Sequence, residues 1–281
     1  GSLLKRPADR TAAPLKLMGA KIRLSGSRAP ARISGAALTG MDHRLVVPSA
    51  QVKSAILLAG LYAQGATSIT ERFRTRDHTE LMLKHLGARI SAVGLNIYLK
   101  PGRLKAKDMR VPGDISSAAP FMVAACLLNG FRLTIKNVGL NPGRTGLVRI
   151  LKAMGAKISV SGRYNSPEPA GDITVSGSRL KGIRVRPDEV PAMVDELPLL
   201  ALAAARAHGT TVINAIGELK HKESDRLRTT LALFKALGLK AAAEKDTLVI
   251  KGPQEIAGGE DARNAQRAEQ IGATAFGGDA T

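Results

Sequence analysis

The stretch MGAKI at residues 18–22 decides the fold, because it returns along the chain at a constant interval. It recurs as LGARI at 86–90 and as MGAKI at 154–158, with 68 residues between successive starts, and more loosely as LGLKA at 237–241. Each copy ends a segment with amphipathic helical periodicity and places a glycine before a segment with strand character, as a C-terminal glycine cap does. The chain therefore repeats one helix-to-strand unit.

A second pattern lies upstream of three of these helices. VPSAQVKSAILLAGLYAQGATSI (47–69), VPGDISSAAPFMVAACLLNGFRLTI (111–135) and RPDEVPAMVDELPLLALAAARAHGTTVI (186–213) each predict a short strand or turn, an Ala/Leu-rich helix, a glycine turn and another strand. Strand pairs such as ARISAVG (88–94) and NIYLKPG (96–102) follow the charged helices. The spacing exceeds the roughly 20 to 50 residues of a solenoid repeat and indicates a repeated α/β unit. We expect the Ala-rich helices to be buried and the charged helices to face water.

The composition is that of a globular protein, since 281 residues that are 44% hydrophobic suffice for one large or two medium domains. No apolar run approaches the roughly 20 residues that span a bilayer. The segment GSLLKRPADR has no hydrophobic signal core, so we expect a cytoplasmic protein with no membrane partner. The single Cys126 lies in the apolar run FMVAACLLNG, which predicts a buried, unreactive thiol.

The charge balance points to an anionic partner. The chain has 42 Lys and Arg residues against 23 Asp and Glu residues, a net charge of +19. Nucleic acid is one reading of this excess. Against it, aromatic residues make up 3% of the chain, Trp is absent, and the basic residues are spread along the sequence, so stacking platforms for single strands are scarce. The alternative interpretation is that the anionic partner is a phosphorylated metabolite.

Polar residues recur at the starts of the predicted helices. A serine at a helix start usually caps the helix, and a charged stretch usually faces water. Here TRDHTE (75–80), NPGRTG (141–146) and HKESDR (221–226) occupy equivalent places in the repeat, and each presents an arginine. Because helix starts offer unpaired N–H groups and a positive dipole end, this repetition favours anion-binding sites.

Six motifs, PSAQVKSAILLAG, TRDHTE, VPGDISSAAPF, NPGRTG, VDELP and KESDR, occur in an order and spacing that resembles the 5-enolpyruvylshikimate-3-phosphate synthase family. The related UDP-N-acetylglucosamine enolpyruvyl transferases carry a cysteine loop before an Arg-Pro pair, whereas here Arg6-Pro7 follows GSLLK. The resemblance implies an inside-out α/β barrel fold of repeated βαβαββ units in two domains, both incomplete in this chain. It places the domains at residues 1–110 and 111–257 and leaves residues 258–281 unmatched. The composition of this tail, rich in Ala, Gly and Gln with little apolar periodicity, predicts a disordered or frame-shifted segment.

The family's PGSKS and GNAGT loops and its C-terminal GDHR segment have no counterpart in this sequence. The resemblance implies transfer of the enolpyruvyl group of phosphoenolpyruvate to the 5-hydroxyl of shikimate 3-phosphate, with release of phosphate. It implies a monomer with no metal, no organic cofactor and no nucleic-acid partner. Two other hypotheses stay open: a non-catalytic homologue that binds phosphorylated metabolites, and a basic RNA-binding protein on a related fold.

The resemblance also assigns roles to individual residues. In the second domain, Asp195 accepts a hydrogen bond from the attacking hydroxyl and acts as its base, Glu223 shuttles the proton of the methylene carbon, and Lys222 grips substrate. Lys222 and Arg226 are spaced i, i+4, so they share one face if this stretch is helical. The resemblance also assigns substrate binding to two sets of residues. Shikimate 3-phosphate is bound by Ser49, Ala50, Gln51, Arg76, Asp195 and Lys222, and phosphoenolpyruvate is bound by Arg6 and Arg226.

Structural roles are the better interpretation for the other polar residues near these motifs. We expect His78 to make a structural hydrogen bond. Arg144 can be either anion-facing or structural, and the structural role is favoured. Asp225 is expected to pair locally. Asp114, with Ser116 and Ser117, is expected to cap a helix.

Overall fold

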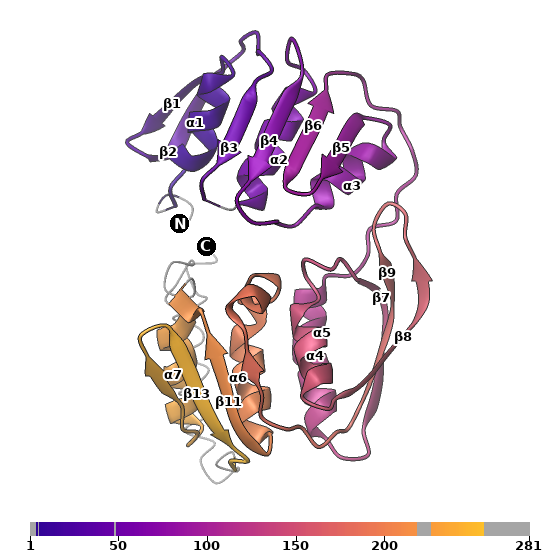
Figure 1. Cartoon of the computed structure of the whole chain (residues 1–281), viewed down its shortest axis with the longest axis vertical. Helices are drawn as coiled ribbons and strands as arrows, with labels where there is room; N and C mark the ends of the chain where they lie inside the picture. Colours follow the sequence, from indigo (N-terminus) through magenta and orange to yellow (C-terminus); the bar gives the residue numbers. More distant parts are fainter. Residues whose placement is uncertain (1–3, 5, 48, 218–225, 256–281) are drawn as a thin grey trace, which may run out of the picture. The chain divides into compact units, whose positions relative to one another are not determined.

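The structure is a computed structural model that describes residues 4, 6–47, 49–217 and 226–255. It contains two compact units (Figure 1). Unit 1 is Gly1–Val111 with the short turn Asn165–Glu168, and unit 2 is Pro112–Tyr164 with Pro169–Thr281. Within the described ranges, no helix is both long and apolar enough to cross a membrane.

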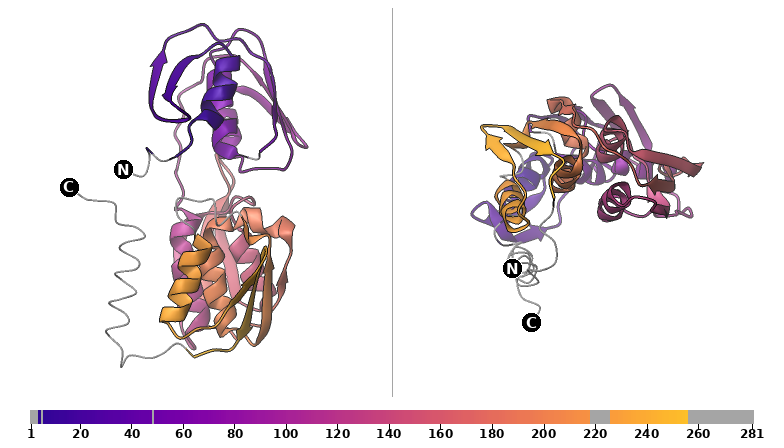
Figure 2. Two further views of the ribbon diagram at one scale, coloured as in Figure 1. Left: turned by 90° about the vertical axis from the view of Figure 1, so that its left-hand side faces the viewer. Right: turned by 90° about the horizontal axis from the view of Figure 1, so that it is seen from below.

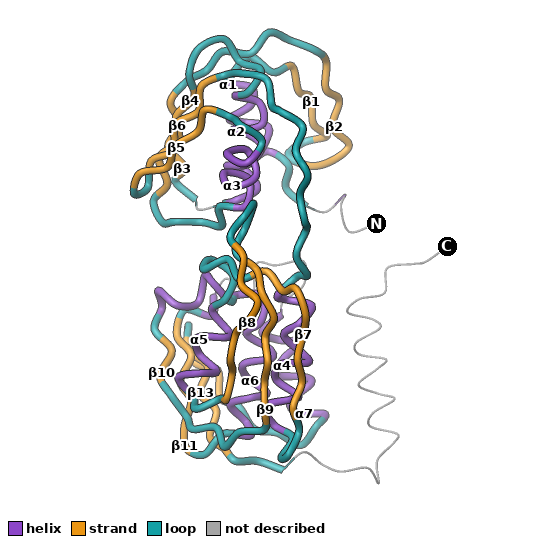
Figure 3. Tube along the Cα trace, turned by 90° about the vertical axis from the view of Figure 1, so that its right-hand side faces the viewer, coloured by secondary structure: helices purple, strands orange, loops and turns teal. Residues whose placement is uncertain are grey.

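Unit 1 is a helical layer between two β structures (Figures 2 and 3). A four-stranded sheet has the order β3-β4-β6-β5, in which β3 and β4 are parallel and the other pairs antiparallel, and a separate antiparallel hairpin joins β1 to β2. The helices are α1 (Asp9–Leu17), α2 (Ala50–Gly60) and α3 (His78–His85). The strands are β1 (Lys21–Ser25), β2 (Arg28–Ser34), β3 (Asp42–Leu45), β4 (Thr67–Glu71), β5 (Arg89–Val93) and β6 (Asn96–Lys100).

Unit 2 encloses its helices between two sheets, which is the inside-out arrangement that the sequence implied (Figure 1). One sheet has the antiparallel order β7-β9-β8, and the other has the order β10-β11-β13-β12 with β10 and β11 parallel. The helices are α4 (Ile115–Leu127), α5 (Gly146–Ala153), α6 (Leu197–Arg206) and α7 (Arg226–Ala236), with the 3-10 turns η2 (Pro187–Ala192) and η3 (Val194–Glu196). The strands are β7 (Arg132–Gly139), β8 (Lys157–Tyr164), β9 (Ala170–Ser176), β10 (Arg184–Val185), β11 (Gly209–Asn214), β12 (Ala242–Glu244) and β13 (Thr247–Gly252).

The repeated glycine motif ends four helices, as the sequence predicted. Gly19, Gly87, Gly155 and Gly238 follow α1, α3, α5 and α7, and each has a left-handed φ between +70° and +102°. At Gly19 a Cβ atom would also lie 2.8 Å from the carbonyl oxygen of Ala37, so a side chain is excluded by space as well as by φ. The predicted strand pair after α3 is also confirmed, because β5 and β6 form a hairpin.

The predicted burial of the Ala-rich helices is correct for α6 and only partly correct for α2 and α4. The described apolar side chains of α6 are buried or half-buried. In contrast, Leu58 of α2 and Phe121 of α4 are 45% and 63% exposed. The reason is that an apolar helix is covered only on the sides where neighbouring elements pack, and periodicity does not count those neighbours. Cys126 of α4 is fully buried, as predicted, and this burial raises the pKa of its thiol to about 11.

Candidate active-site residues

The start of α2 in unit 1 presents backbone hydrogen-bond donors and a serine N-cap. Ser49 is the N-cap in extended conformation, and its Oγ accepts a hydrogen bond from the Val52 N–H at 3.4 Å. Ala50 and Gln51 are the first two helical residues, and helix geometry leaves their N–H groups without an intrahelical acceptor. No acidic side chain lies in the first turn. This helix end therefore presents donors and a positive dipole end, with no carboxylate of its own in the first turn.

Arg76 lies in the loop between β4 and α3, two residues before α3 begins. Its side chain is half-buried, and it forms no ion pair with any residue that the structure describes. Its neighbour Arg74 is exposed and pairs with Asp77 at 3.2 Å. Arg76 is thus available for an external anion, whereas Arg74 already has a carboxylate partner.

Buried contacts hold the starts of α2 and α3 side by side. Lys53, in the first turn of α2, bonds through Nζ to Glu80 Oε1 of α3 at 2.6 Å. Ser54, one residue after Lys53, and Thr79, one residue before Glu80, share a hydroxyl hydrogen bond of 2.6 Å. Since Ser49 precedes Lys53 by four residues and Arg76 precedes Glu80 by four residues, the predicted residues of this site gather at one end of the helix pair.

Arg6 lies on a different segment of unit 1, before α1. Its neighbour Pro7 forms an antiparallel bridge with Arg28 at the start of β2, and Arg6 itself is exposed. The described contacts therefore tie this segment to the β1–β2 hairpin.

In unit 2, the structure brings two predicted residues together in a way that the sequence did not indicate. Asp195 lies in η3, just ahead of α6, and Arg226 is the first residue of α7. Arg226 Nη1 donates to Asp195 Oδ1 at 2.8 Å, and the two side chains are 28% and 31% exposed. The family resemblance implies that each of them contacts substrate, which the ion pair does not test. Lys222, Glu223 and Asp225 lie outside the described residues.

A second network surrounds Glu196, the neighbour of Asp195. Glu196 is buried and accepts a hydrogen bond from the Ser116 hydroxyl. Arg144 binds Asp114 Oδ1 at 3.1 Å and the Ser116 hydroxyl. Burial raises the pKa of Glu196, although the Ser116 hydrogen bond and the charge of Arg144 act in the opposite direction. The sequence placed Glu196 in the VDELP motif but gave it no role, because its burial depends on contacts with α4.

The three repeat-equivalent arginines therefore differ in their partners. Arg144 and Arg226 each bind a carboxylate that precedes an Ala-rich helix, Asp114 and Asp195 respectively. At the equivalent place before α2 stands Ser49, which has no charge, and Arg76 is without a carboxylate partner among the described residues. Unit 1 thus keeps an arginine available for an anion.

A sequence profile of the EPSP synthase family, also described as 3-phosphoshikimate 1-carboxyvinyltransferase, matches residues 1–265. The chain belongs to the EPSP synthase family. Relatives named 3-phosphoshikimate 1-carboxyvinyltransferase come from Shouchella clausii, 45% identical over 262 residues, and from Thermus thermophilus, 47% identical over 257 residues. These matches cover 92% and 89% of this chain, and 61% and 60% of the relatives.

Solved structures agree with this assignment to the EPSP synthase family. An EPSP synthase structure from Acinetobacter baumannii superposes with a TM-score of 0.84 at 41% sequence identity, covering 96% of this chain and 65% of that chain. The predicted inside-out α/β fold is therefore confirmed. The chain spans about three fifths of the length of the curated family members that it matches.

The structural roles predicted for three polar residues of this EPSP synthase family member are also found. Asp114 caps α4, accepting from the Ser116 N–H at 3.2 Å, and Arg144 is structural because it binds this cap. His78 Nδ1 lies 2.8 Å from the Glu168 carboxylate in the turn Asn165–Glu168 of unit 1.

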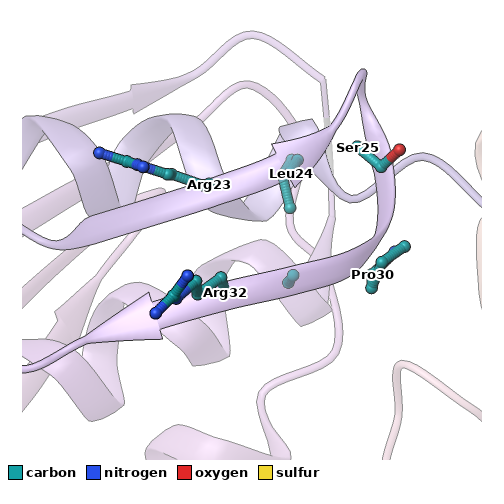
Figure 4. A pocket seen from close by; sticks show the side chains of 6 residues that line it. Arg23, Leu24, Ser25, Pro30 and Arg32 are labelled. Atoms are coloured by element: carbon teal, nitrogen blue, oxygen red, sulfur yellow. The ribbon is translucent and has the colours of Figure 1, made fainter.

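One surface depression contains none of the predicted site residues (Figure 4). Its lining belongs to the β1–β2 hairpin and includes Arg23 and Arg32, which stand directly opposite each other across the two strands. Elsewhere in the described ranges, no three His, Cys, Asp or Glu side chains gather closely enough to share a metal ion.

Proposed function

We propose that this chain takes part in the transfer of the enolpyruvyl group of phosphoenolpyruvate to the 5-hydroxyl of shikimate 3-phosphate, with release of phosphate. The observation that carries the proposal is that the N-cap of α2, Ser49, is uncharged and Arg76 has no carboxylate partner among the described residues, whereas the other two repeat copies place a carboxylate against their arginine. The names of the relatives give the reaction that such a phosphate site serves in this family.

In unit 1, we assign the phosphate of shikimate 3-phosphate to Ser49, Ala50, Gln51 and Arg76. The Ser49 hydroxyl and the N–H groups of Ala50 and Gln51 donate hydrogen bonds, and the helix dipole favours the dianion. The Arg76 guanidinium adds a bidentate, charge-assisted contact. The half-burial of Arg76 supports this role, because partial removal from water strengthens an ionic contact.

In unit 2, we assign the 5-hydroxyl to Asp195 and phosphoenolpyruvate to Arg226. The hydroxyl oxygen forms a bond to the central carbon of phosphoenolpyruvate while Asp195 accepts its proton and the methylene carbon gains one. The bond to the phosphate oxygen then breaks and the methyl group loses a proton, which leaves the enol ether. Arg226 is paired with Asp195 here, so transfer of its guanidinium to the phosphate of phosphoenolpyruvate would make that carboxylate oxygen available to the hydroxyl.

The remaining assignments follow the family resemblance. Lys222 grips both substrates, Glu223 carries the proton to and from the methylene carbon, and Arg6 binds phosphoenolpyruvate with Arg226. We also propose two domains, residues 1–110 and 111–257, for which the separate contact clusters before and after Val111 are support. A monomeric state, a cytoplasmic location, and a reaction without nucleic acid stay predictions.

The test is phosphate release from shikimate 3-phosphate plus phosphoenolpyruvate, measured for the chain and for Asp195→Ala. General-base catalysis contributes about 10²–10⁴-fold, so we expect release by the chain and a loss of at least about 100-fold in the variant. Calorimetric titration with shikimate 3-phosphate runs in parallel. Binding without release would identify a binding homologue, and absence of binding by a folded chain would overturn the proposal.

A further inference from the structure

We propose that Glu71, held by Lys53, is a positioning residue for Arg76, and that the buried ion network of Lys53, Glu71 and Glu80 fixes the phosphate-binding end of unit 1. The inference rests on the proposed function and adds residues that the sequence motifs did not single out. Lys53 lies inside the Ala-rich helix α2, Glu71 ends β4, and Glu80 lies in the first turn of α3.

The network joins the two halves of the phosphate site through one carboxylate. Glu71 Oε2 binds Lys53 Nζ at 3.2 Å, and the Lys53 N–H donates to the Ser49 carbonyl at 3.0 Å. Glu71 Oε1 accepts from the Thr75 N–H at 3.3 Å and from the Thr75 hydroxyl. Thr75 immediately precedes Arg76. A single glutamate therefore connects the helix that begins after Ser49 to the backbone that carries Arg76.

Burial makes this network costly to desolvate. Lys53 is 1% exposed, and the side chains of Glu71 and Glu80 are 3% and 8% exposed. Two carboxylates share one ammonium group, and Glu80 Oε2 has no hydrogen-bond partner among the described residues. Well-packed apolar side chains are often as stabilising as buried ions, so retaining three buried charges points to a geometric role.

Comparison with the repeat in unit 2 explains why Glu71 binds the residue before Arg76 and not Arg76 itself. In unit 2 the equivalent arginine, Arg144, is held by direct contact with Asp114. A carboxylate placed directly on Arg76 would hold it equally well but would compete with a phosphate ligand. The Glu71 carboxylate instead grips the neighbouring residue, so the loop is ordered while the Arg76 guanidinium stays available.

A double-mutant cycle on the intact chain tests this inference. Titration calorimetry with shikimate 3-phosphate compares wild type, Glu71→Ala, Arg76→Met and the double variant. Loss of a charge-assisted contact predicts a Kd raised about tenfold or more in Arg76→Met, and we expect a rise of about fivefold or more in Glu71→Ala. If Glu71 acts through Arg76, the double variant binds no more weakly than Arg76→Met alone. Additive losses would overturn the inference.

Two further variants separate positioning from loss of stability. Leu99→Ala removes a fully buried side chain of β6 that lies near Gly60, at the other end of α2, and should lower the Tm of unit 1 while leaving the Kd within about twofold. Glu71→Gln keeps an acceptor for Thr75 and should restore most of the affinity that Glu71→Ala loses. A Kd that follows the Tm across all these variants would assign Glu71 a purely structural role.

Hydrogen exchange without ligand keeps the inference separate from the proposed function. We expect Glu71→Ala to speed amide exchange in residues 72–77 at least about fivefold more than Leu99→Ala does. If wild type failed to bind shikimate 3-phosphate, the proposed function would fall, and the exchange result alone would decide whether Glu71 orders the loop. Equal exchange in the two variants would overturn the positioning role.

Discussion

The arginine at the same position of the repeat has different partners in the two units. In unit 1, Arg76 has no carboxylate partner among the described residues, and a buried ion network binds the residue that precedes it. In unit 2, Arg144 and Arg226 each form an ion pair with an aspartate that precedes an Ala-rich helix. The repeated fold thus supplies a cation at a fixed place, and the residue opposite it determines whether that cation is structural or available to a ligand.

The two units also differ in how deeply their ion pairs are buried. The ion network of unit 1 is almost fully buried, whereas the Arg144–Asp114 pair of unit 2 has side chains that are 18% and 55% exposed. Buried pairs are costly to break because one charge is left uncompensated, and exposed pairs are screened by water. We therefore expect similar substitutions to have unequal effects in the two units.

The largest expected effect is on stability, from Lys53→Met. This change leaves Glu71 and Glu80 buried without a cation, and breaking a buried pair costs about 3–5 kcal/mol. Arg144→Met in unit 2 removes a more exposed pair and should cost about 1 kcal/mol. Urea unfolding of both variants measures the difference. The matched control, Lys53→Met with Glu71→Gln and Glu80→Gln, leaves no buried charge and should recover part of the loss. Equal losses in the two units would refute the contrast in burial.

The next effect is on binding, from Ser49→Asp, which gives unit 1 the carboxylate that unit 2 already has. Aspartate is as good an N-cap as serine, so the free energy of unfolding should change little. The new carboxylate should pair with Arg76 and repel a phosphate, so the Kd for shikimate 3-phosphate should rise about tenfold or more. Ser49→Asn, a neutral cap of the same shape, is the control and should raise the Kd far less. If both variants bound equally, charge at this position would not decide ligand binding.

The glycine spacing allowed much of the fold to be predicted from the sequence. The helix ends at Gly19, Gly87 and Gly155 depend on local backbone conformation, which a sequence motif reports directly. The exposure of Phe121 could not be predicted in the same way, since it depends on which elements pack against α4. Features that depend on local backbone conformation could therefore be predicted from the sequence, and features that depend on neighbouring elements could not.

The same limit applies to the candidate site. The motifs identified Asp195 and Arg226, but their ion pair joins residues that are 31 positions apart and depends on how η3 meets α7. A lysine in a helix is usually exposed, so the sequence does not indicate that Lys53 is buried, and the fold shows that it binds two glutamates. The sequence motifs thus identified individual residues, whereas ion pairs between distant segments could be identified only from the structure.

A smaller effect is expected from Asp114→Asn in unit 2. Asparagine still caps α4, but it removes the charge that binds Arg144, and an exposed pair contributes about 0.5 kcal/mol. Thermal unfolding should therefore show a slight decrease in Tm, because the Ser116 hydroxyl still holds Arg144. Ala124→Ser, a change at an exposed position of α4 away from this cap, is the control. A loss as large as that of Lys53→Met would mean that exposure does not separate the two networks.

The smallest effect is the opposite pH dependence of two buried groups, His43 in unit 1 and Glu196 in unit 2. Burial lowers the pKa of His43, despite the nearby charge of Asp42, so the unfolded chain takes up a proton at about pH 6.5 while the folded chain resists it. The stability of unit 1 should therefore fall as the pH drops below about 6.5.

Burial raises the pKa of Glu196 above its usual value of 4.5, so the folded chain binds the proton first as the pH falls. Its stabilising contribution is complete below pH 4.5 and is lost as the pH rises through the raised pKa. Hydrogen exchange from pH 7 to 5 should show unit 1 weakening, while Glu196 makes unit 2 less sensitive to acid. His43→Gln should make unit 1 less sensitive to acid, and Glu196→Gln should make unit 2 more sensitive to acid, each without changing the other unit. If both units lost stability in parallel and neither variant altered the slope, other groups would govern the acid response.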